Sequence, residues 1–462
     1  MSDRILHLFK NSVIFLIGNL GTKLISFLMV PFFTYYLSTS QFGTVDLITN
    51  TVAMMTPIVS LSIFDAVFRF VMDTEENPQS LYTNGLIVSL VGVVIGILLS
   101  VSISPFLSFD FGLEFGVLLG LSALNSFFLN FVRGIGKVKL FAFAGFLFGV
   151  LNALLNIIFV MLLHLGVEGV LLASILGSLI SILIVMVFGK THLYFKLKLA
   201  SKAEIKKMIH FSLPLIPNAF AWWFTTDASR FFILYFVGTQ GNGFYAVANK
   251  IPTILTIVFS VFSQAWQISA VQSFEESDRS KFYSVVFNSL MSCLFVGVAV
   301  LTFFSQTIMH WLVAPDFFEA WKLTPFLLLA MMFSNLSGFL GTTYIAAKKT
   351  AAIFWTTIVG MVLNGVFNLI FIPIFGVDGA GIGSSMGFLV VMLIRLYNTK
   401  NIIGINMKWF DFLSNISLFS LLVYLVRFSN LSAFYAAFVL LIIIAINGRG
   451  MYPMLKKIRH RS

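Results

Sequence analysis

The chain has 462 residues, of which 59% are hydrophobic and only 10% charged, and its mean hydropathy is +0.98. A soluble domain carries about 25% charged residues, so this composition excludes a soluble protein. The formal net charge of +11 does not predict a nucleic-acid partner, because lysine and arginine collect on the cytoplasmic side of membrane proteins and face anionic lipids there. The lone cysteine, Cys293, allows no intrachain disulfide.

Apolar stretches repeatedly exceed the roughly 18–20 residues that span a bilayer, and they lack the alternating pattern of a transmembrane β-strand. Backbone amides in hydrocarbon need internal partners, so we expect an all-α polytopic membrane protein. About fourteen transmembrane helices are predicted. In chain order they cover 12–36, 42–68, 84–104, 115–133, 141–163, 168–189, 211–236, 243–272, 284–306, 321–346, 353–375, 378–399, 411–427 and 432–448.

The lysines and arginines predict the orientation of these helices. With the N-terminus in the cytoplasm, 24 of the 29 cations, Arg395 among them, fall at inside segments, and only Lys322 and Arg427 fall outside. The remaining three, Lys23, Arg230 and Lys250, lie within helices. Under the positive-inside rule both termini are therefore expected in the cytoplasm, and we interpret the first apolar run as a retained helix rather than a cleaved signal.

An internal repeat relates the two halves of the chain. A shift of 200 residues brings matching residues together: Ser12 and Ser212, Thr39 and Thr239, Gly43 and Gly243, Thr56 and Thr256, Ser60 and Ser260. Further on, Asn152-x3-Asn156 followed by Gly166-Val-Glu-Gly169 matches Asn364-x3-Asn368 followed by Gly376-Val-Asp-Gly379. Six helices per copy give both halves the same direction. We predict two pseudo-symmetric six-helix bundles in a parallel repeat, which is typical of transporters.

The repeat divides the chain into four predicted regions. Residues 1–190 form an N-terminal six-helix lobe and 191–210 a basic, amphipathic cytoplasmic linker. Residues 211–400 form a C-terminal six-helix lobe, and 401–462 add two further transmembrane helices and a basic cytoplasmic tail. The linker is expected on the cytoplasmic membrane surface because it is rich in lysine.

Polar stripes on the first two helices of each half predict a hydrated cleft, since such groups would be wasted against lipid. An ionised residue near the bilayer centre costs about 2.5–3.5 kcal/mol, which favours a function for the cations within helices. Basic groups in such a cleft suit an anionic ligand. The candidate substrate-binding residues are Lys23, Arg230, Lys250, Asn19, Asn249 and Trp222.

Four further charged residues are candidates for ion coupling or for structural pairs. Asp227 and Arg230 are three residues apart on a helix, and Asp65 and Arg69 are four apart, so each could form an ion pair. Asp46 has no such neighbour and is a candidate cleft residue. The sequence holds no Walker loop, HExxH, Cys/His cluster or GxSxG motif. We therefore expect no catalytic residue, metal or cofactor.

Several short motifs stand out by their order and spacing. They are Lys10-Asn-Ser, Gly18-Asn-Leu-Gly21, Pro31-Phe-Phe-Thr-Tyr-Tyr-Leu37, Gln41-Phe-Gly-Thr44 and Gly376-Val-Asp-Gly-Ala380. With the helix count and the basic loop between halves, they resemble bacterial polysaccharide repeat-unit exporters of the multidrug/oligosaccharidyl-lipid/polysaccharide exporter superfamily. The resemblance covers the whole chain and implies a V-shaped cleft between two lobes, often lined by cations.

This resemblance implies a flippase that moves an undecaprenyl-pyrophosphate-linked oligosaccharide across the bacterial cytoplasmic membrane. The product would feed the assembly of O-antigen, capsule, exopolysaccharide or teichoic-type polymer. The implied partners are this lipid-linked oligosaccharide, membrane lipids, a polysaccharide polymerase and chain-length proteins.

Two other functions remain open. A cation-coupled multidrug exporter of the same superfamily would use acids such as Asp46 or Asp227 to bind H⁺ or Na⁺. A membrane-embedded polysaccharide polymerase or ligase would need a large outer loop with catalytic arginine or histidine, and the predicted outer loops are short.

Overall fold

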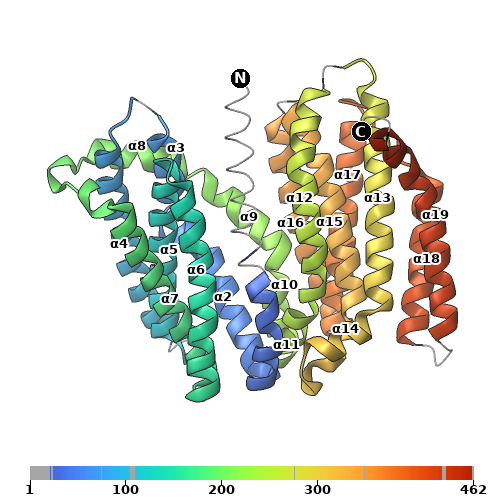
Figure 1. The fold of residues 1–462 in the computed structure, drawn as a ribbon, viewed down its shortest axis with the longest axis horizontal. Coiled ribbons are helices and arrows are strands. Elements are labelled where there is room, and N and C mark those ends of the chain that lie inside the picture. Colours follow the sequence, from blue (N-terminus) through green and yellow to red (C-terminus); the bar gives the residue numbers. More distant parts are fainter. Residues whose placement is uncertain are drawn as a thin grey trace. The chain divides into compact units, whose positions relative to one another are not determined.

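The computed structural model describes residues 21, 24–73, 75–104, 110–274, 276–347, 349–428 and 433–459. Within these ranges all regular secondary structure is helical, which confirms the all-α prediction. The chain divides into two compact units, Met1–Trp223 and Phe224–Ser462. Figure 1 shows their helices. This division falls inside the predicted helix 211–236, and the four regions drawn from the sequence remain predictions.

The first unit begins with a helix over Leu24–Tyr36. Its further helices are α2 (Thr39–Val59), α3 (Ile63–Val71), α4 (Pro78–Ile103), α5 (Gly112–Gly134), α6 (Val138–Asn156), the π-helix η2 (Ile157–Leu162), α7 (Gly166–Gly189), the short 3₁₀ helices η3 (Thr191–Tyr194) and η4 (Leu197–Leu199), α8 (Lys202–Ser212), and most of α9 (Leu215–Asp227).

The second unit holds the end of α9 and a similar series of helices. They are α10 (Ser229–Phe236), α11 (Thr239–Ala248), α12 (Lys250–Gln272), α13 (Arg279–Phe303), α14 (Ser305–Leu312), η5 (Pro315–Lys322), α15 (Thr324–Ala346), α16 (Thr350–Phe375), α17 (Val377–Thr399), α18 (Trp409–Arg427) and α19 (Ala433–Arg459).

Ten helices in the described ranges are long and apolar enough to cross a membrane, and the bent pair α11–α12 makes an eleventh. Two shorter apolar helices, Leu24–Tyr36 and Ala433–Gly448, coincide with the first and last predicted spans. The predicted span 211–236 corresponds to α9 and α10, separated at Ala228. The count of fourteen is thus consistent with the structure, although the structure does not establish it.

Several predicted helices are broken in the structure. The predicted helix 42–68 is interrupted after Pro57, where Leu61 and Ser62 both adopt positive φ, 52° and 47°. Proline removes a backbone donor and clashes with the preceding turn, and two successive left-handed residues turn the chain before α3 starts. In the second unit, α11 and α12 meet at an angle of 41°.

The internal repeat is visible in the backbone of both units. The helices α2 and α11 start at Thr39 and Thr239, 200 residues apart as the alignment predicts. A glycine with positive φ stands at the start of both α7 and α17: φ is 56° at Gly166, the first residue of α7, and 60° at Gly376, directly before α17. Only glycine adopts this conformation without a steric penalty, which explains why the motif keeps it.

The matched asparagines also make the same contacts in each unit. Asn156 Nδ2 donates to the carbonyl and side-chain oxygens of Asn152 at 2.8 and 2.9 Å. In the second unit, Asn368 Nδ2 donates to the same two atoms of Asn364 at 2.8 and 2.6 Å. Each pair thus joins two successive turns of its own helix, α6 or α16.

The segment that follows α7 docks on the first unit through the start of α4. Asn84 Nδ2 donates to Leu199 O at 2.9 Å, and its Oδ1 accepts from Ser201 N at 2.8 Å. The predicted basic linker is thus partly helical, and α8 packs on α3 and α4. Lys207 of α8 forms an ion pair with Glu76, and this hydrogen bond raises the pKa of the lysine.

The segment that follows α17 docks on α13 in the same way. Asn288 Nδ2 donates to Asn406 O at 2.8 Å, and its Oδ1 accepts from Lys408 N at 3.0 Å. The last two helices are joined by Asn415 and Asn447, whose side-chain amides donate to each other. Arg427 at the end of α18 pairs with Asp378 in the first turn of α17.

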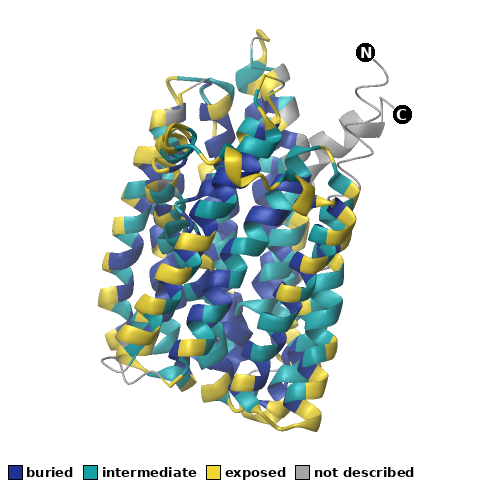
Figure 2. Ribbon diagram, turned by 90° about the vertical axis from the view of Figure 1, so that its left-hand side faces the viewer, coloured by how far each residue is buried: buried dark blue, intermediate teal, exposed yellow. Residues whose placement is uncertain are grey.

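Many large apolar side chains of the helices are exposed. Figure 2 shows exposed positions spread along the helices. Leu98, Val187 and Leu441 are each more than half exposed. Soluble monomers rarely expose extended apolar surface, whereas lipid tails are a suitable solvent for it. The buried side chains, such as those of Tyr82, Phe127 and Phe131, pack between helices instead.

Candidate functional site

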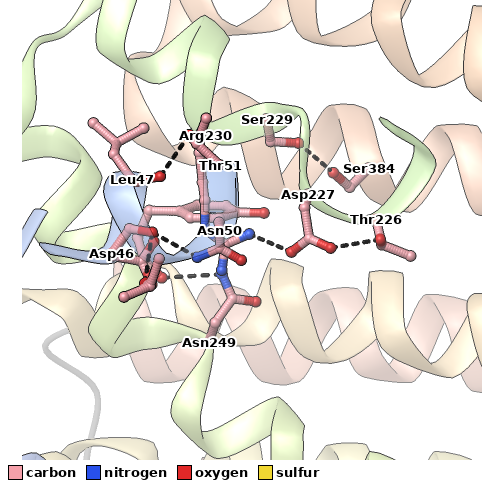
Figure 3. Close-up of polar contacts among 12 residues, drawn as sticks. Asp46, Leu47, Asn50, Thr51, Thr226, Asp227, Ser229, Arg230, Asn249 and Ser384 are labelled. Carbon is pink, nitrogen blue, oxygen red and sulfur yellow. Dashed lines mark hydrogen bonds and ion pairs between the residues drawn. The ribbon is translucent and has the colours of Figure 1, made fainter. Parts of the chain in front are cut away.

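A buried ion pair lies at the junction of α9 and α10 in the second unit. Asp227 is the last residue of α9 and Arg230 the second residue of α10. Arg230 Nη1 donates to Asp227 Oδ1 at 2.6 Å, and only 10% of the arginine side chain is exposed. The predicted pairing of these two residues, three apart on a helical turn, is therefore present in the structure (Figure 3).

Neighbouring polar and aromatic groups hold this pair in place. Thr226 Oγ1 donates to Asp227 Oδ2 at 2.6 Å, so both carboxylate oxygens are engaged. The guanidinium of Arg230 lies 5.4 Å from the ring centroid of Tyr245 on α11, a cation–π distance. The hydroxyls of Ser229 and Ser384 lie 3.2 Å apart and connect α10 to α17.

The bend between α11 and α12 places two more of the predicted residues. Asn249 lies at the bend, where its Nδ2 donates to Tyr245 O at 3.0 Å and its carbonyl accepts from Thr253 Oγ1 at 2.8 Å. Lys250, the first residue of α12, is half-buried. Arg230 and Asn249 therefore both contact Tyr245, and Lys250 directly follows Asn249 in the chain.

The other predicted cleft residues are distributed differently. Asn19 and Lys23 lie outside the described residues. Trp222 belongs to the first unit, and 55% of it is exposed. Asp46 also belongs to the first unit, on α2, where its carbonyl accepts from Asn50 Nδ2 at 2.7 Å. The cleft itself stays a prediction.

Asp65 and Arg69 do not form the ion pair that their spacing allows. Asp65 lies in the first turn of α3, partly buried, whereas Arg69 lies in its last turn and is exposed. No ion pair joins the two among the described residues. An acid in the first turn of a helix is stabilised by the free amides there, which gives Asp65 a favourable position without Arg69.

One cation near the end of a helix is buried. Arg395, predicted at a cytoplasmic end, lies four residues before the end of α17 and is 5% exposed. Its Nε and Nη2 donate to Thr356 and Thr357 of α16 at 3.1 and 3.3 Å, and its Nη1 donates to the carbonyl of Ser337 on α15 at 3.0 Å. Its position five residues before Lys400 suggested a helix end, and only the packing of α15 and α16 reveals that it is covered.

The described residues contain no group of three or more histidines, cysteines, aspartates or glutamates that could hold a metal ion. Arg230, Asp227, Thr226 and Tyr245 together form what we call the Arg230 cluster. Its guanidinium can recognise a negatively charged group. A planar guanidinium presents several donors in a fixed fork that matches phosphate and carboxylate oxygens.

Solved structures similar to this chain include two kinds of transporter. A lipid II flippase, MurJ, in an inward closed conformation matches with a TM-score of 0.66 and 14% identity, over 97% of this chain and 99% of that one. A multidrug resistance MATE family transporter in an inward-facing conformation matches with a TM-score of 0.68 and 17% identity, over 84% of this chain and 94% of that one. The chain therefore shares its fold with these two membrane proteins.

Sequence comparison gives the family of the chain. The model of the polysaccharide biosynthesis protein family matches residues 8–268, more than half of the chain. Protein 1 of the Lsg locus of Haemophilus influenzae is 24% identical over 273 residues, which cover 56% of this chain and 64% of that protein. The matched part thus spans just under two thirds of this curated relative. The chain belongs to the polysaccharide biosynthesis protein family, as the motifs in its sequence predict.

Proposed function

We propose that this protein moves an oligosaccharide repeat unit, linked to undecaprenyl pyrophosphate, from the inner to the outer leaflet of the bacterial cytoplasmic membrane. It does so by alternating access and with both termini in the cytoplasm. The observation that carries the proposal is the match of residues 8–268 to the polysaccharide biosynthesis family, on a fold shared with a lipid II flippase. The protein acts as a carrier and not as an enzyme.

The chemistry of such a substrate accounts for the buried cations. A pyrophosphate must leave water to cross the membrane, and a buried anion needs a cation and hydrogen-bond donors to be tolerated. Arg230 supplies both in a largely buried position. Asp227 and Tyr245 fix the orientation of the guanidinium, and Lys250 adds charge at the start of α12.

A cation-coupled multidrug exporter is the second candidate, favoured by the similarity to MATE transporters. Such an exporter would need a carboxylate that binds H⁺ or Na⁺. Asp227 accepts hydrogen bonds from Arg230 and Thr226 at 2.6 Å each, so an arginine already balances its charge. A drug-sensitivity profile of the deletion strain separates the two functions, since only a drug exporter makes the strain sensitive.

The test of the leading proposal is transport by purified protein in proteoliposomes. The substrate is the lipid-linked oligosaccharide extracted from the deletion strain. Arg230→Gln should slow translocation by about 10–100-fold, the factor that corresponds to losing a hydrogen bond to a charged group of about 1.5–3 kcal/mol. Lys250→Gln and Lys23→Gln should also slow it, while all three variants still insert into the membrane.

Arg427→Gln is the matched control. The side chains of Arg427 and Asp378 are 11% and 29% exposed, and those of Arg230 and Asp227 are 10% and 30% exposed. Both substitutions therefore break an equally buried ion pair of the second unit, but only Arg230 is assigned to the substrate. Equal transport by Arg230→Gln and wild type would refute the role of this residue, and no transport by wild type would refute the function itself.

A further inference from the structure

An open cavity of about 480 Å³ lies inside the first unit, among α2, α3, α5, α6 and α7. Among the described residues, those that line it carry no charge, and all of them belong to the first unit. Arg230 and its partner Asp227 belong to the second unit and are not part of this lining. Six hydroxyl-bearing residues line it: Thr49, Thr56, Ser122, Ser126, Ser174 and Ser178.

These hydroxyls form stripes at helical spacing on three helices. Ser122 and Ser126 lie four residues apart on α5, and Ser174 and Ser178 lie four apart on α7. Thr49 and Thr56 lie seven apart on α2. Residues at these spacings share one helix face, so three hydroxyl-bearing faces converge on the same space.

Half of the hydroxyls have no hydrogen-bond partner in the described chain. Thr49, Thr56 and Ser174 donate to carbonyls of their own helices at 2.8, 2.7 and 3.0 Å.

Ser122, Ser126 and Ser178 make no side-chain hydrogen bond among the described residues, although Ser178 is only 3% exposed. A hydroxyl without a protein partner can donate to and accept from a molecule that enters the cavity. The cavity thus offers three free donors together with acceptor oxygens to a polar ligand.

We propose that this cavity binds a neutral sugar ring of the transported repeat unit, an inference that rests on the proposed function. A sugar ring has the matching chemistry, because its hydroxyls both donate and accept and its C–H faces are apolar. Phe64 and Phe148 supply flat apolar surface in the lining. The volume falls within the range of about 300–1,000 Å³ that binds small organic ligands, enough for one or two sugar rings.

Other ligand classes fit these residues less well. A lipid tail would leave the hydroxyls of Ser122, Ser126 and Ser178 unpaired. Among the described lining residues, a phosphate would find no cation, and Mg²⁺ or Ca²⁺ would find none of the carboxylates that such ions select. A neutral sugar is therefore the ligand class that the described lining of this cavity fits best.

The test measures sugar binding to the full chain in lipid nanodiscs by saturation-transfer NMR. The probes are glucose, galactose, N-acetylglucosamine and maltose, each at millimolar concentration. At least one should give a signal with wild type, and the triple variant Ser122→Ala, Ser126→Ala, Ser178→Ala should bind it about tenfold more weakly. Ser178→Phe should abolish the signal by filling the cavity while leaving the other hydroxyls in place.

Ser89→Ala is the control, because this buried serine of α4 bonds only its own helix, to Gly85 O at 2.9 Å, and lies outside the cavity. The inference fails if no sugar gives a signal, or if wild type and the triple variant give equal signals. Proteoliposome transport separates this failure from that of the proposed function. Normal transport by wild type and by Ser178→Phe would overturn the sugar site alone, whereas absent transport by wild type would overturn the function.

Discussion

The two units share one helical plan but place different polar groups inside it. Aligning Gly166 with Gly376 brings Gly177 of α7 onto Gly387 of α17. A side chain at Gly177 would meet Asn152 and Phe148, and one at Gly387 would meet Asn364. Because Asn152 and Asn364 are themselves matched in the sequence, the same pair of helices is packed through the same contact in each unit.

The same alignment shows where the units differ. Ser178, which lines the cavity of the first unit, corresponds to Phe388, a buried ring in the second. Val185, fully buried in the first unit, corresponds to Arg395, which bonds three helices together in the second. Glycines and asparagines that set the backbone approach are kept, whereas side chains between the helices have diverged. One unit has a neutral cavity, and the other has buried charge.

The largest difference in stability between the units is expected at Gly169 of α7 and Gly379 of α17, which are matched in the repeat, when each is replaced by alanine. A Cβ at Gly379 would collide with the backbone carbonyl of Phe371, whereas at Gly169 its nearest atoms are Phe159 C at 3.1 Å and Leu165 Cβ at 3.2 Å. The added Cβ at Gly379 would overlap backbone that must move, whereas at Gly169 a shift of a few tenths of an ångström makes room. Gly379→Ala should therefore lower the free energy of unfolding by about 3 kcal/mol and Gly169→Ala by about 1 kcal/mol. Unfolding followed by tryptophan fluorescence in detergent measures both.

Gly145→Ala on α6 is the control for this pair, because nothing lies within 4 Å of its added Cβ. Alanine favours a helix over glycine by roughly 0.8–1 kcal/mol, so this variant should be as stable as wild type or more so. Equal losses at Gly169 and Gly379 would contradict the closer approach of α16 and α17.

Arg395→Val introduces the valine that stands at the matched position, Val185, of the first unit. It should cause the next largest loss of stability. It removes the hydrogen bonds to Thr356, Thr357 and Ser337, each worth about 0.6 kcal/mol on average between membrane helices, so the loss should be about 2 kcal/mol. The same unfolding measurement applies.

Arg395→Lys should recover little of this loss, because an ammonium cannot reach three acceptors in the planar arrangement of a guanidinium. A variant Arg395→Val that is more stable than wild type would mean that desolvation of the charge outweighs its hydrogen bonds.

The sequence predicted the helical class, the order of the helices and the repeat, because long apolar runs and a constant shift are local properties of the chain. It also predicted the Asp227–Arg230 pair, whose members share one helical turn. Pro57 and Pro252 also predict bends in the helices 42–68 and 243–272. The left-handed turn at Ser62 and the bend at Asn249 lie near these prolines, but the apolar pattern continues through both positions and does not locate them.

Contacts between helices distant in the chain were beyond the reach of the sequence. The stripe of Ser122 and Ser126 was visible in principle, but its significance depends on facing Ser178 and Thr49 across a cavity. The burial of Arg395 was not predicted for the same reason, because a residue near a helix end is exposed or buried according to what packs over it.

The smallest difference in stability between the units is expected at the segments that follow α7 and α17, which are held by Asn84 and Asn288. Asn84 and Asn288 each bond a carbonyl and an amide two residues apart, in Leu199 and Ser201 or in Asn406 and Lys408. Asn84 is fully buried, whereas Asn288 is half-buried. In Asn84→Ala, Leu199 O and Ser201 N therefore lose their partner at a site that water does not reach.

Asn84→Ala should cost about 2 kcal/mol, and Asn288→Ala under about 1 kcal/mol because water can replace its lost bonds. Limited proteolysis at Lys196 or Lys198 measures the first docking, and cleavage at Lys400 or Lys408 measures the second. Each alanine variant should speed cleavage of its own segment only. If Asn84→Ala also sped cleavage at Lys400, the two segments would be coupled, and their docking would depend on more than the start of α4 and of α13.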